Sequence, residues 1–365
     1  MLDMNEMLKI IVERDGSDLH CAVGKPTVMR ISGKLDIVDP DILKPEDTER
    51  LMREITPPRY QQQLQEQGST DFAYAYSDLA RFRTAVFRTR GNIGIVMRLI
   101  PHRILSFDEL GLPKESIIDI LNSHRGLVIV TGPTGSGKTT SLATMIDYVN
   151  ANRYVHIITV EDPIEYHHPH KKAIVTHREL HVDTPTFAFA MRGALRQDPD
   201  VILLGEMRDL ETMEAALVAA ETGHLVFSTL HTISAAQTVD RVVDAFPVTQ
   251  QEQIRSVLSV ALKTIIAQTL LPRASGKGRI AAYEILHNIP AVQNLIREHK
   301  TNRIVSTIQT SSKLGMITLD DYLLNIYRKG LITGEVALER CHFLSEMRMK
   351  MMQIKQGEED EEMVE

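Results

Sequence analysis

The sequence predicts an α/β protein in which a small α+β domain precedes a larger domain built around a parallel sheet. In residues 1–100, helical and strand-like segments follow one another without a phosphate-binding motif. From Ile117 to about Leu271, apolar strand-like runs alternate with segments of helical spacing, which is typical of a parallel sheet with helices on both faces. With 365 residues, 43% of them hydrophobic, the chain is long enough for two such domains.

The N-terminal domain is expected to span residues 1–100. Its predicted helices are residues 1–14, 45–55 and 58–67, and its predicted strands are residues 18–23, 27–32, 70–76, 80–89 and 93–100. Residues 101–113 contain two prolines and two turn signals, so we expect an interdomain linker there. The second domain is then expected to span residues 114–356.

The second domain contains a phosphate-binding loop. Residues 127–131 are an apolar run typical of a buried parallel strand, and residues 141–149 have helical spacing. Between them lies a match to G-x-x-x-x-G-K-[ST] in the strand, loop and helix context that this motif requires, which disfavours a chance glycine-rich turn. The matching residues are Gly132, Pro133, Thr134, Gly135, Ser136, Gly137, Lys138, Thr139 and Thr140.

This loop predicts binding of ATP and Mg²⁺. Its glycines allow successive backbone N–H groups to face the phosphates, and the dipole of the following helix adds positive potential at the same place. Lys138 is expected to hold the β- and γ-phosphate oxygens, and Thr139 to bind the metal ion.

Glu206 is the predicted catalytic carboxylate. It follows the apolar strand 201–204 and Gly205, one residue past the place where many P-loop proteins carry an aspartate. From there a carboxylate can reach the attacking water and, partly through water, the metal ion. The alternative is a solvated glutamate at a helix start, beside Asp209 and Glu211, which suit the dipole of the predicted helix 210–221.

Two further strand ends carry polar residues, where open parallel sheets place their ligands. Glu161 and Asp162 end the apolar run 157–160 and suit Mg²⁺ or an arginine, although helix caps and exposed charges are the alternative. The second run, 225–230, has a histidine on each side. We expect His231 to sense the γ-phosphate, and His224 to be structural or to lie at a subunit contact.

Charge and composition disfavour nucleic acid as a partner. The formal net charge is -7, but residues 357–365 contain six acids, and without them the chain has 41 basic and 42 acidic residues. A nucleic-acid groove normally shows a local excess of Lys and Arg. The acidic residues 357–365 are expected to be a disordered tail.

Other sequence features predict a cytoplasmic protein without direct membrane insertion. Cys21 and Cys341 are the only cysteines, and their distance in sequence indicates neither a disulfide framework nor a zinc ribbon. No apolar stretch approaches the length of a bilayer span, and the first residues do not resemble a signal peptide.

Four segments together resemble the Walker A, Asp box, Walker B and His box of the type II/IV secretion ATPase superfamily: residues 132–140, 158–165, 198–209 and 221–231. Residues 16–20 and 291–298 further resemble marker segments of the twitching-motility, or pilus retraction, ATPases. The second marker departs from the pattern AIRNLIRE at Val292 and Gln293, which leaves open a main or an auxiliary retraction motor. A tetracysteine zinc site, found in pilus extension motors, does not occur.

The resemblance implies a homohexameric ring with ATP bound between subunits, each with a PAS-like N-terminal domain and a RecA-like ATPase domain followed by a helical C-terminal region. It implies a motor that retracts type IV pilus fibres at the cytoplasmic face of the inner membrane, acting on a membrane platform protein. A RecA-like nucleic-acid translocase and a nucleotide-dependent assembly switch remain alternatives.

Three arginines of the N-terminal domain suit such a ring. Arg81 and Arg83 lie two residues apart on one predicted strand, hence on one face, and Arg98 lies on the next strand. The N-terminal domain has no phosphate loop, so an anion that binds this arginine cluster would have to come from another part of the assembly. The γ-phosphate of ATP bound to a neighbouring subunit is a candidate. Surface salt bridges are the alternative, and their expected partners are Asp71, Asp78 and Glu109.

The region after residue 271 is expected to be mostly helical, interrupted by a strand-like segment, 279–287. Residues 290–298 have amphipathic spacing, with Val292, Leu295 and Ile296 toward a core and Gln293, Arg297 and Glu298 outward. Periodicity alone predicts a packing helix, and the resemblance suggests a role in coupling hydrolysis to retraction.

Overall fold

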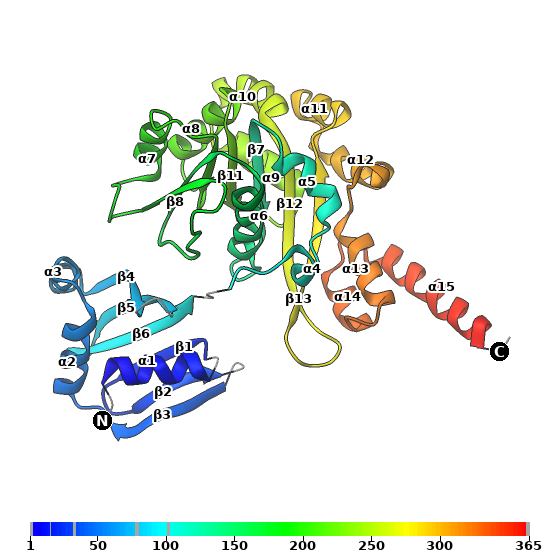
Figure 1. Cartoon of the computed structure of the whole chain (residues 1–365). Helices are drawn as coiled ribbons and strands as arrows, with labels where there is room; N and C mark the ends of the chain where they lie inside the picture. The colour runs from blue at the N-terminus through cyan, green and yellow to red at the C-terminus, as the bar shows by residue number, and fades with distance from the viewer. Residues whose placement is uncertain (1–2, 15, 32–33, 77–79, 101–102, 363–365) are drawn as a thin grey trace. The chain divides into compact units, whose positions relative to one another are not determined.

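The computed structural model of the chain forms two compact units (Figure 1). It describes residues 3–14, 16–31, 34–76, 80–100 and 103–362, with side chains to residue 354. The smaller unit comprises residues 1–103 with 163–166, and the larger comprises residues 104–162 with 167–365. The division after Arg103 falls inside the predicted linker, but Phe107–Leu110 (α4) already belongs to the larger unit.

The smaller unit is built on an antiparallel six-stranded sheet in the order β3-β2-β1-β6-β5-β4. Its strands are Asp18–Ala22 (β1), Pro26–Ile31 (β2), Lys34–Ile42 (β3), Ser69–Tyr76 (β4), Ala80–Thr89 (β5) and Asn92–Ile100 (β6). Its helices are Met4–Glu13 (α1), Pro45–Ile55 (α2) and Pro58–Gln67 (α3). Strand β3 has no counterpart among the predicted strands, because it is an edge strand whose exposed charged residues and Pro40 hide the strand pattern.

The larger unit contains a seven-stranded sheet in the order β13-β12-β7-β11-β10-β8-β9. All of its neighbouring pairs are parallel except β12 with β13. The strands are Gly126–Thr131 (β7), His156–Glu161 (β8), Ile174–Glu179 (β9), Val201–Leu204 (β10), Leu225–Leu230 (β11), Leu262–Pro272 (β12) and Arg279–His287 (β13). The predicted parallel sheet is therefore present, with an antiparallel edge strand.

Helices cover the sheet and continue into the C-terminal region (Figure 1). Successive residues of β7 point to opposite faces of the sheet and pack in two different apolar clusters. Leu127 and Ile129 belong to one cluster, and Val128 and Val130 belong to the other. The helices after α4 are Lys114–Leu121 (α5), Lys138–Asn152 (α6), Phe187–Ala194 (α7), Leu210–Glu221 (α8), Ala235–Asp244 (α9), Val248–Ala261 (α10), Pro290–Arg297 (α11), Ile304–Thr310 (α12), Leu319–Arg328 (α13), Gly334–Arg340 (α14) and Leu344–Glu362 (α15).

The C-terminal third can be compared with the sequence prediction at three segments. The predicted strand 279–287 is present as β13, and instead of lying within a helical region it pairs along its length with β12 and completes the sheet. Helix α15 has its last residue at Glu362, and the disorder expected for residues 357–365 stays a prediction. The predicted helix 290–298 is present as α11, with Val292 and Ile296 fully buried and Leu295 packed against the same cluster.

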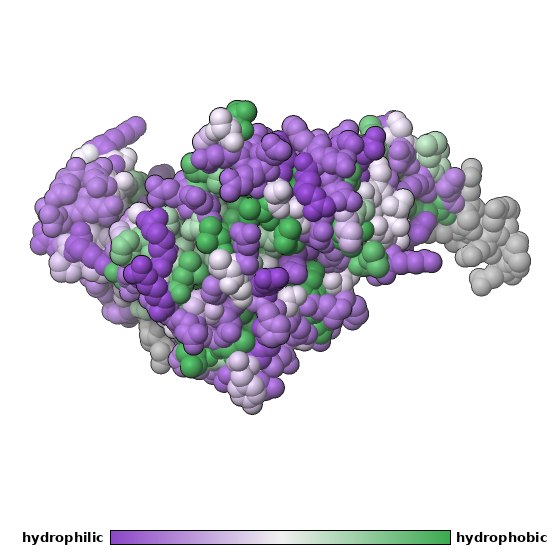
Figure 2. Space-filling view, turned by 90° about the horizontal axis from the view of Figure 1, so that it is seen from above, coloured by the Kyte–Doolittle hydropathy of each residue, from purple (hydrophilic) through white to green (hydrophobic). Residues whose placement is uncertain are grey.

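Within the described residues, none of the helices combines the length and the apolar composition needed to cross a membrane. In the face drawn in Figure 2, hydrophilic residues predominate, and apolar residues lie between them in small groups.

The central strand β11 provides a test of this core. Phe227 is fully buried between the sheet and its helical layer, whereas Phe189 on α7 is 53% exposed. Phe227→Ala should lower the free energy of unfolding of the larger unit by about 3–5 kcal/mol, because it removes buried apolar surface and leaves a cavity. Phe189→Ala should change it by less than about 1 kcal/mol. Denaturant unfolding would measure both, and equal losses would contradict the assigned core.

Candidate functional site

The candidate residues meet at one edge of the large sheet. Strands β7, β11, β10 and β8 are parallel neighbours, so their carboxyl ends lie together. The phosphate loop follows β7, and Glu206 and His231 follow β10 and β11, while Glu161 ends β8. Residues far apart in sequence are thus brought to one place by the strand order.

The loop backbone has the conformation that glycine permits. Gly132, Gly135 and Gly137 have φ values of 145°, 78° and 88°, in the region that other residues rarely adopt. At Gly132 space is lacking as well, because a Cβ atom there would lie 2.1 Å from the carbonyl oxygen of Gln268. A side chain at this position would therefore displace the loop from β12.

The loop presents donors suited to a phosphate group. Lys138 is buried, and its Nζ donates to the carbonyl oxygens of Gly132 at 2.8 Å and Pro133 at 3.1 Å. The Ser136 hydroxyl is buried without a hydrogen-bond partner among the described residues. Lys138, at the start of α6, fits an anionic ligand, whereas the Ser136 hydroxyl lies under the loop beside Gly132. Thr139 lies half-buried in the first turn of α6, next to Lys138.

Glu206 lies within a small charged group. One carboxylate oxygen is 2.6 Å from the Arg208 guanidinium, and the other is 3.4 Å from His231 Nε2. The Glu206 side chain is only 14% exposed, whereas those of Arg208 and His231 are 69% and 53% exposed. Two partners therefore fix the direction of a carboxylate that is itself largely withdrawn from solvent. Arg208 was missed by the sequence analysis, although it lies only two residues beyond Glu206.

Glu161 is buried at the end of β8, beside the strand that leads to Glu206. The Gly205 N–H donates to the Val160 carbonyl at 2.8 Å, which joins the two strand ends. His177 Nδ1 lies 3.9 Å from Glu161 Oε1. The structure thus places Glu161 at the expected edge of the sheet, next to a histidine that the sequence analysis did not select.

A stacked group of histidines borders Glu161. The rings of His167 and His168 each stack on His177, with centroid distances of 5.1 and 5.9 Å. Burial, together with the neighbouring His177, lowers the pKa of His168 to about 4. His168 is therefore neutral at physiological pH and acts in packing rather than as a charge.

The histidines flanking β11 lie at opposite ends of that strand, about 20 Å apart for six residues. His224 Nδ1 lies 2.9 Å from the Ala219 carbonyl oxygen of helix α8, away from the phosphate loop. The backbone after His231 is held near the loop, because Thr131 Oγ1 donates to the Thr232 carbonyl at 2.7 Å. Of the two histidines, His231 is therefore the one at the site.

A cavity of about 380 Å³ opens beside the loop residues Gly137 and Thr140 and has the size of a small-ligand site. Its other lining residues include Leu105, Leu270, Arg273, Arg279 and Ala281.

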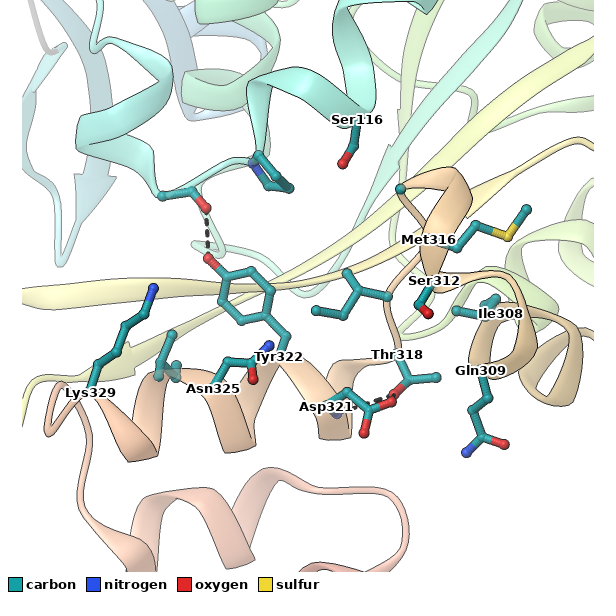
Figure 3. A pocket seen from close by; sticks show the side chains of 15 residues that line it. Ser116, Ile308, Gln309, Ser312, Met316, Thr318, Asp321, Tyr322, Asn325 and Lys329 are labelled. Atoms are coloured by element: carbon teal, nitrogen blue, oxygen red, sulfur yellow. Dashed lines mark hydrogen bonds between the residues drawn. The ribbon is translucent and has the colours of Figure 1, made fainter. Parts of the chain in front are cut away.

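A larger cavity of about 580 Å³ lies between α5 and α13, where Tyr322 donates to the Gly111 carbonyl at 2.6 Å (Figure 3). The smaller cavity is the better candidate, because it alone of these two includes phosphate-loop residues.

The three arginines of the smaller unit share one face of its sheet. Arg83 on β5 is directly opposite Arg98 on β6, and Arg81 lies two residues from Arg83. The buried residues of β5, including Phe82 and Thr84, occupy the other face. The arginines are therefore grouped as the sequence predicts.

Arg98 has an ion-pair partner that the sequence analysis did not consider. Its Nε donates to Asp18 Oδ1 on β1 at 2.8 Å, and the two residues are cross-strand neighbours. The expected partners were Asp71, Asp78 and Glu109; of these, Asp78 lies outside the described residues. This pair makes Arg98 the least available of the three for a ligand, although 70% of its side chain is exposed.

The chain matches the family described as Type II/IV secretion system protein over residues 3–319. It is 47% identical to the type IV pilus retraction ATPase PilT of Pseudomonas aeruginosa over 340 residues, which cover 93% of this chain and 98% of that protein. It is 39% identical to the type IV pilus ATPase PilU of the same organism over 360 residues, with coverage of 99% and 93%.

Solved structures give the same result. A crystal structure of the pilus retraction motor PilT with bound ADP matches with a TM-score of 0.88 at 46% identity, covering 95% of this chain and 99% of that one. The ATPase DotB of Legionella pneumophila matches with a TM-score of 0.77 at 28% identity, covering 92% and 94%. The similarity therefore extends far beyond the phosphate loop.

Substitution of Glu206 tests the catalytic assignment. Glu206→Gln keeps the shape but removes the charge, so ATP hydrolysis should fall at least about a hundredfold while nucleotide affinity changes by no more than a few-fold. The matched control is Glu211→Gln, since the Glu211 side chain is 72% exposed and pairs only loosely, at 3.9 Å, with Arg192. Steady-state hydrolysis and equilibrium binding would measure both. Retention of more than about a tenth of the activity would show that another group acts as the base.

Proposed function

Since the chain belongs to the type II/IV secretion system protein family and is a homologue of the PilT retraction ATPase, we propose that it hydrolyses ATP to power retraction of type IV pili. The observation that carries this proposal is the convergence of the phosphate loop, Glu206 and His231 at one edge of the sheet. The proposal assigns to this chain the activity named for PilT, because the similarity covers nearly the whole length of the chain.

The loop residues have separate tasks in the proposed reaction. Lys138 exchanges the carbonyl oxygens that it now contacts for β- and γ-phosphate oxygens, which are stronger acceptors because they are charged. The backbone N–H groups of the loop and of the start of α6 bind the remaining phosphate oxygens. Their common effect is to hold the terminal phosphate in line with an attacking water.

Glu206 is the proposed group that orients and deprotonates this water. Arg208 and His231 hold its two oxygens from different sides, so the carboxylate has a defined direction before substrate binds. His231 contacts the γ-phosphate, so that the conformation of the segment leading into α9 depends on whether this phosphate is present. Glu161, from the neighbouring strand, adds negative charge at the metal side of the site.

Mg²⁺ fits the oxygen donors at this edge. Thr139 would bind it directly, and Glu206 partly through water. When bound, the ion neutralises charge that develops on the phosphoryl group.

We propose that the active form is a homohexamer in which Arg81, Arg83 and Arg98 act on the ATP of a neighbouring subunit. Arg83 supports this best, because it is exposed and has no ion-pair partner among the described residues, whereas Arg98 is paired with Asp18. A guanidinium from one subunit would bind a γ-phosphate held by the next and would lose it on hydrolysis. Hydrolysis would then change how adjacent subunits are held together.

The proposed partner outside the ring is a pilus platform protein of the inner membrane, reached from the cytoplasmic face. The near-neutral charge of the chain without its last nine residues supports a protein partner rather than nucleic acid. Identity to PilT exceeds identity to PilU, 47% against 39%, which favours a main motor over an auxiliary one.

Surface pili in the source organism test the direction of the motor. Cells that carry Glu206→Gln in place of the native chain should lose twitching motility but keep their surface pili, because extension continues while retraction stops. Cells with Glu211→Gln should twitch normally. Twitching zones and electron microscopy of pili would measure this, and loss of the pili themselves would indicate an assembly motor instead.

Mixed rings test whether the arginine acts between subunits. Lys138→Ala and Arg83→Ala should each lower hydrolysis by about a hundredfold or more, the first by loss of nucleotide and the second by loss of transition-state stabilisation. Mixed in equal amounts, they should recover about a quarter of the active sites, because an intact loop can then meet an intact Arg83 of the neighbour. Arg90→Ala, in the turn before β6, is the control. Absence of recovery in verified mixed rings would show that Arg83 acts within its own subunit or not at all.

A further inference from the structure

We infer that Gln268 is a positioning residue that holds the phosphate loop in its binding conformation. Gln268 lies in β12 and is 4% exposed. Its side-chain Nε2 donates to the Ser136 carbonyl at 2.7 Å, and its Oε1 accepts from the Ser141 hydroxyl at 2.7 Å. One amide therefore joins the loop to the first turns of α6. The inference rests on the proposal that residues 132–140 bind the phosphates.

The orientation of this amide is determined by its partners. The Ser136 carbonyl can only accept, so it requires the amide nitrogen, and the amide oxygen is left to face Ser141. Ser136 and Ser141 are 3% and 0% exposed, so water cannot replace these bonds. Loss of the amide would leave the buried Ser136 carbonyl without its donor, and would leave the Ser141 hydroxyl with the Tyr283 hydroxyl as its remaining side-chain partner.

Close contacts with the backbone and side chain of Gln268 also explain why two positions of the loop are glycines. A Cβ atom at Gly132 would lie 2.1 Å from the Gln268 carbonyl oxygen, and one at Gly137 would lie 2.9 Å from its Nε2. The loop therefore packs directly against Gln268 at both ends. The Gln268 amide also holds the Ser136 carbonyl toward β12, which restrains the loop in a conformation whose N–H groups can face an anion.

The same residue connects the loop to the rest of the larger unit. Gln268 is the cross-strand partner of Tyr283 on β13, whose hydroxyl donates to the Leu110 carbonyl at 3.1 Å. The Tyr283 ring in turn packs edge to face on Tyr322 of α13, with centroids 5.5 Å apart. The loop is thus supported through β12 and β13 rather than by its own strand and helix alone.

Gln268→Met tests the inference, because methionine has a similar volume and neither polar group. The affinity for ADP should fall on the order of tenfold, since the loop loses two buried hydrogen bonds. A double-mutant cycle with Ser141→Ala should be non-additive, because both substitutions remove the same bond. Thermal unfolding and circular dichroism would verify that the variants are folded, and Gln250→Met, on the exposed surface of α10, is the control.

Gln268→Glu adds a pH-dependent measurement that distinguishes loss of the hydrogen bond to Ser136 from a general loss of packing. As a neutral acid, the introduced group can still donate to the Ser136 carbonyl, but as a carboxylate it cannot. The ADP affinity of this variant relative to the native protein should therefore fall as pH rises through the pKa of the introduced acid, which burial raises. Gln268→Met and Gln250→Glu should show no such relative pH dependence.

The outcomes separate this inference from the proposed function. Lys138→Ala should abolish ADP binding; if it does not, the phosphate site itself is wrongly assigned. If Lys138→Ala abolishes binding while folded Gln268→Met stays within about twofold of the native affinity, the positioning role is refuted. If Gln268→Met fails to fold, the pH dependence of Gln268→Glu decides, and a flat profile overturns the inference.

Discussion

The site depends on the parallel pairing of β7, β11, β10 and β8, which brings four strand ends to one edge. Each strand is buried on both faces and ends in a polar residue or loop, so the backbone hydrogen bonds of the sheet hold the site residues in place. The bond from Gly205 N–H to the Val160 carbonyl and that from Thr131 to the Thr232 carbonyl continue this pairing beyond the strands. The position of Glu206 is therefore a property of the sheet rather than of a flexible loop.

The features predicted from sequence are those whose signal is local. The phosphate loop is one contiguous motif, and Glu206 and His231 each follow an apolar run that identifies a buried strand end. Parallel-sheet topology then requires such ends to lie together, which the strand order confirms. Arg83 and Arg98 were grouped correctly for the same reason, because alternation along a strand fixes the face.

The features that sequence could not give depend on long-range pairing. Gln268 contacts Ser136 across 132 residues, and Asp18 meets Arg98 across 80, so no local pattern marks either pair. The sequence predicts β13 as an isolated strand in a helical region. Its pairing with β12 is hidden, because β12 follows directly from helix α10 without a turn signal. Each of these cases requires the register of the sheet, which a single sequence does not contain.

Gln268 also begins a series of contacts that runs from the phosphate loop to the C-terminal helices. Tyr283, its cross-strand partner, contacts Tyr322, whose hydroxyl is bound to the Gly111 carbonyl and whose pKa burial raises to about 12. Tyr322 therefore stays protonated and keeps donating to that carbonyl across the physiological pH range. Because close-packed groups cannot shift independently, a change in the loop conformation must be accommodated by Gln268, β13 or α13. The pairing of Gln268 with Tyr283 and the ring contact of Tyr283 with Tyr322 thus link the phosphate loop to the helical region that follows the sheet.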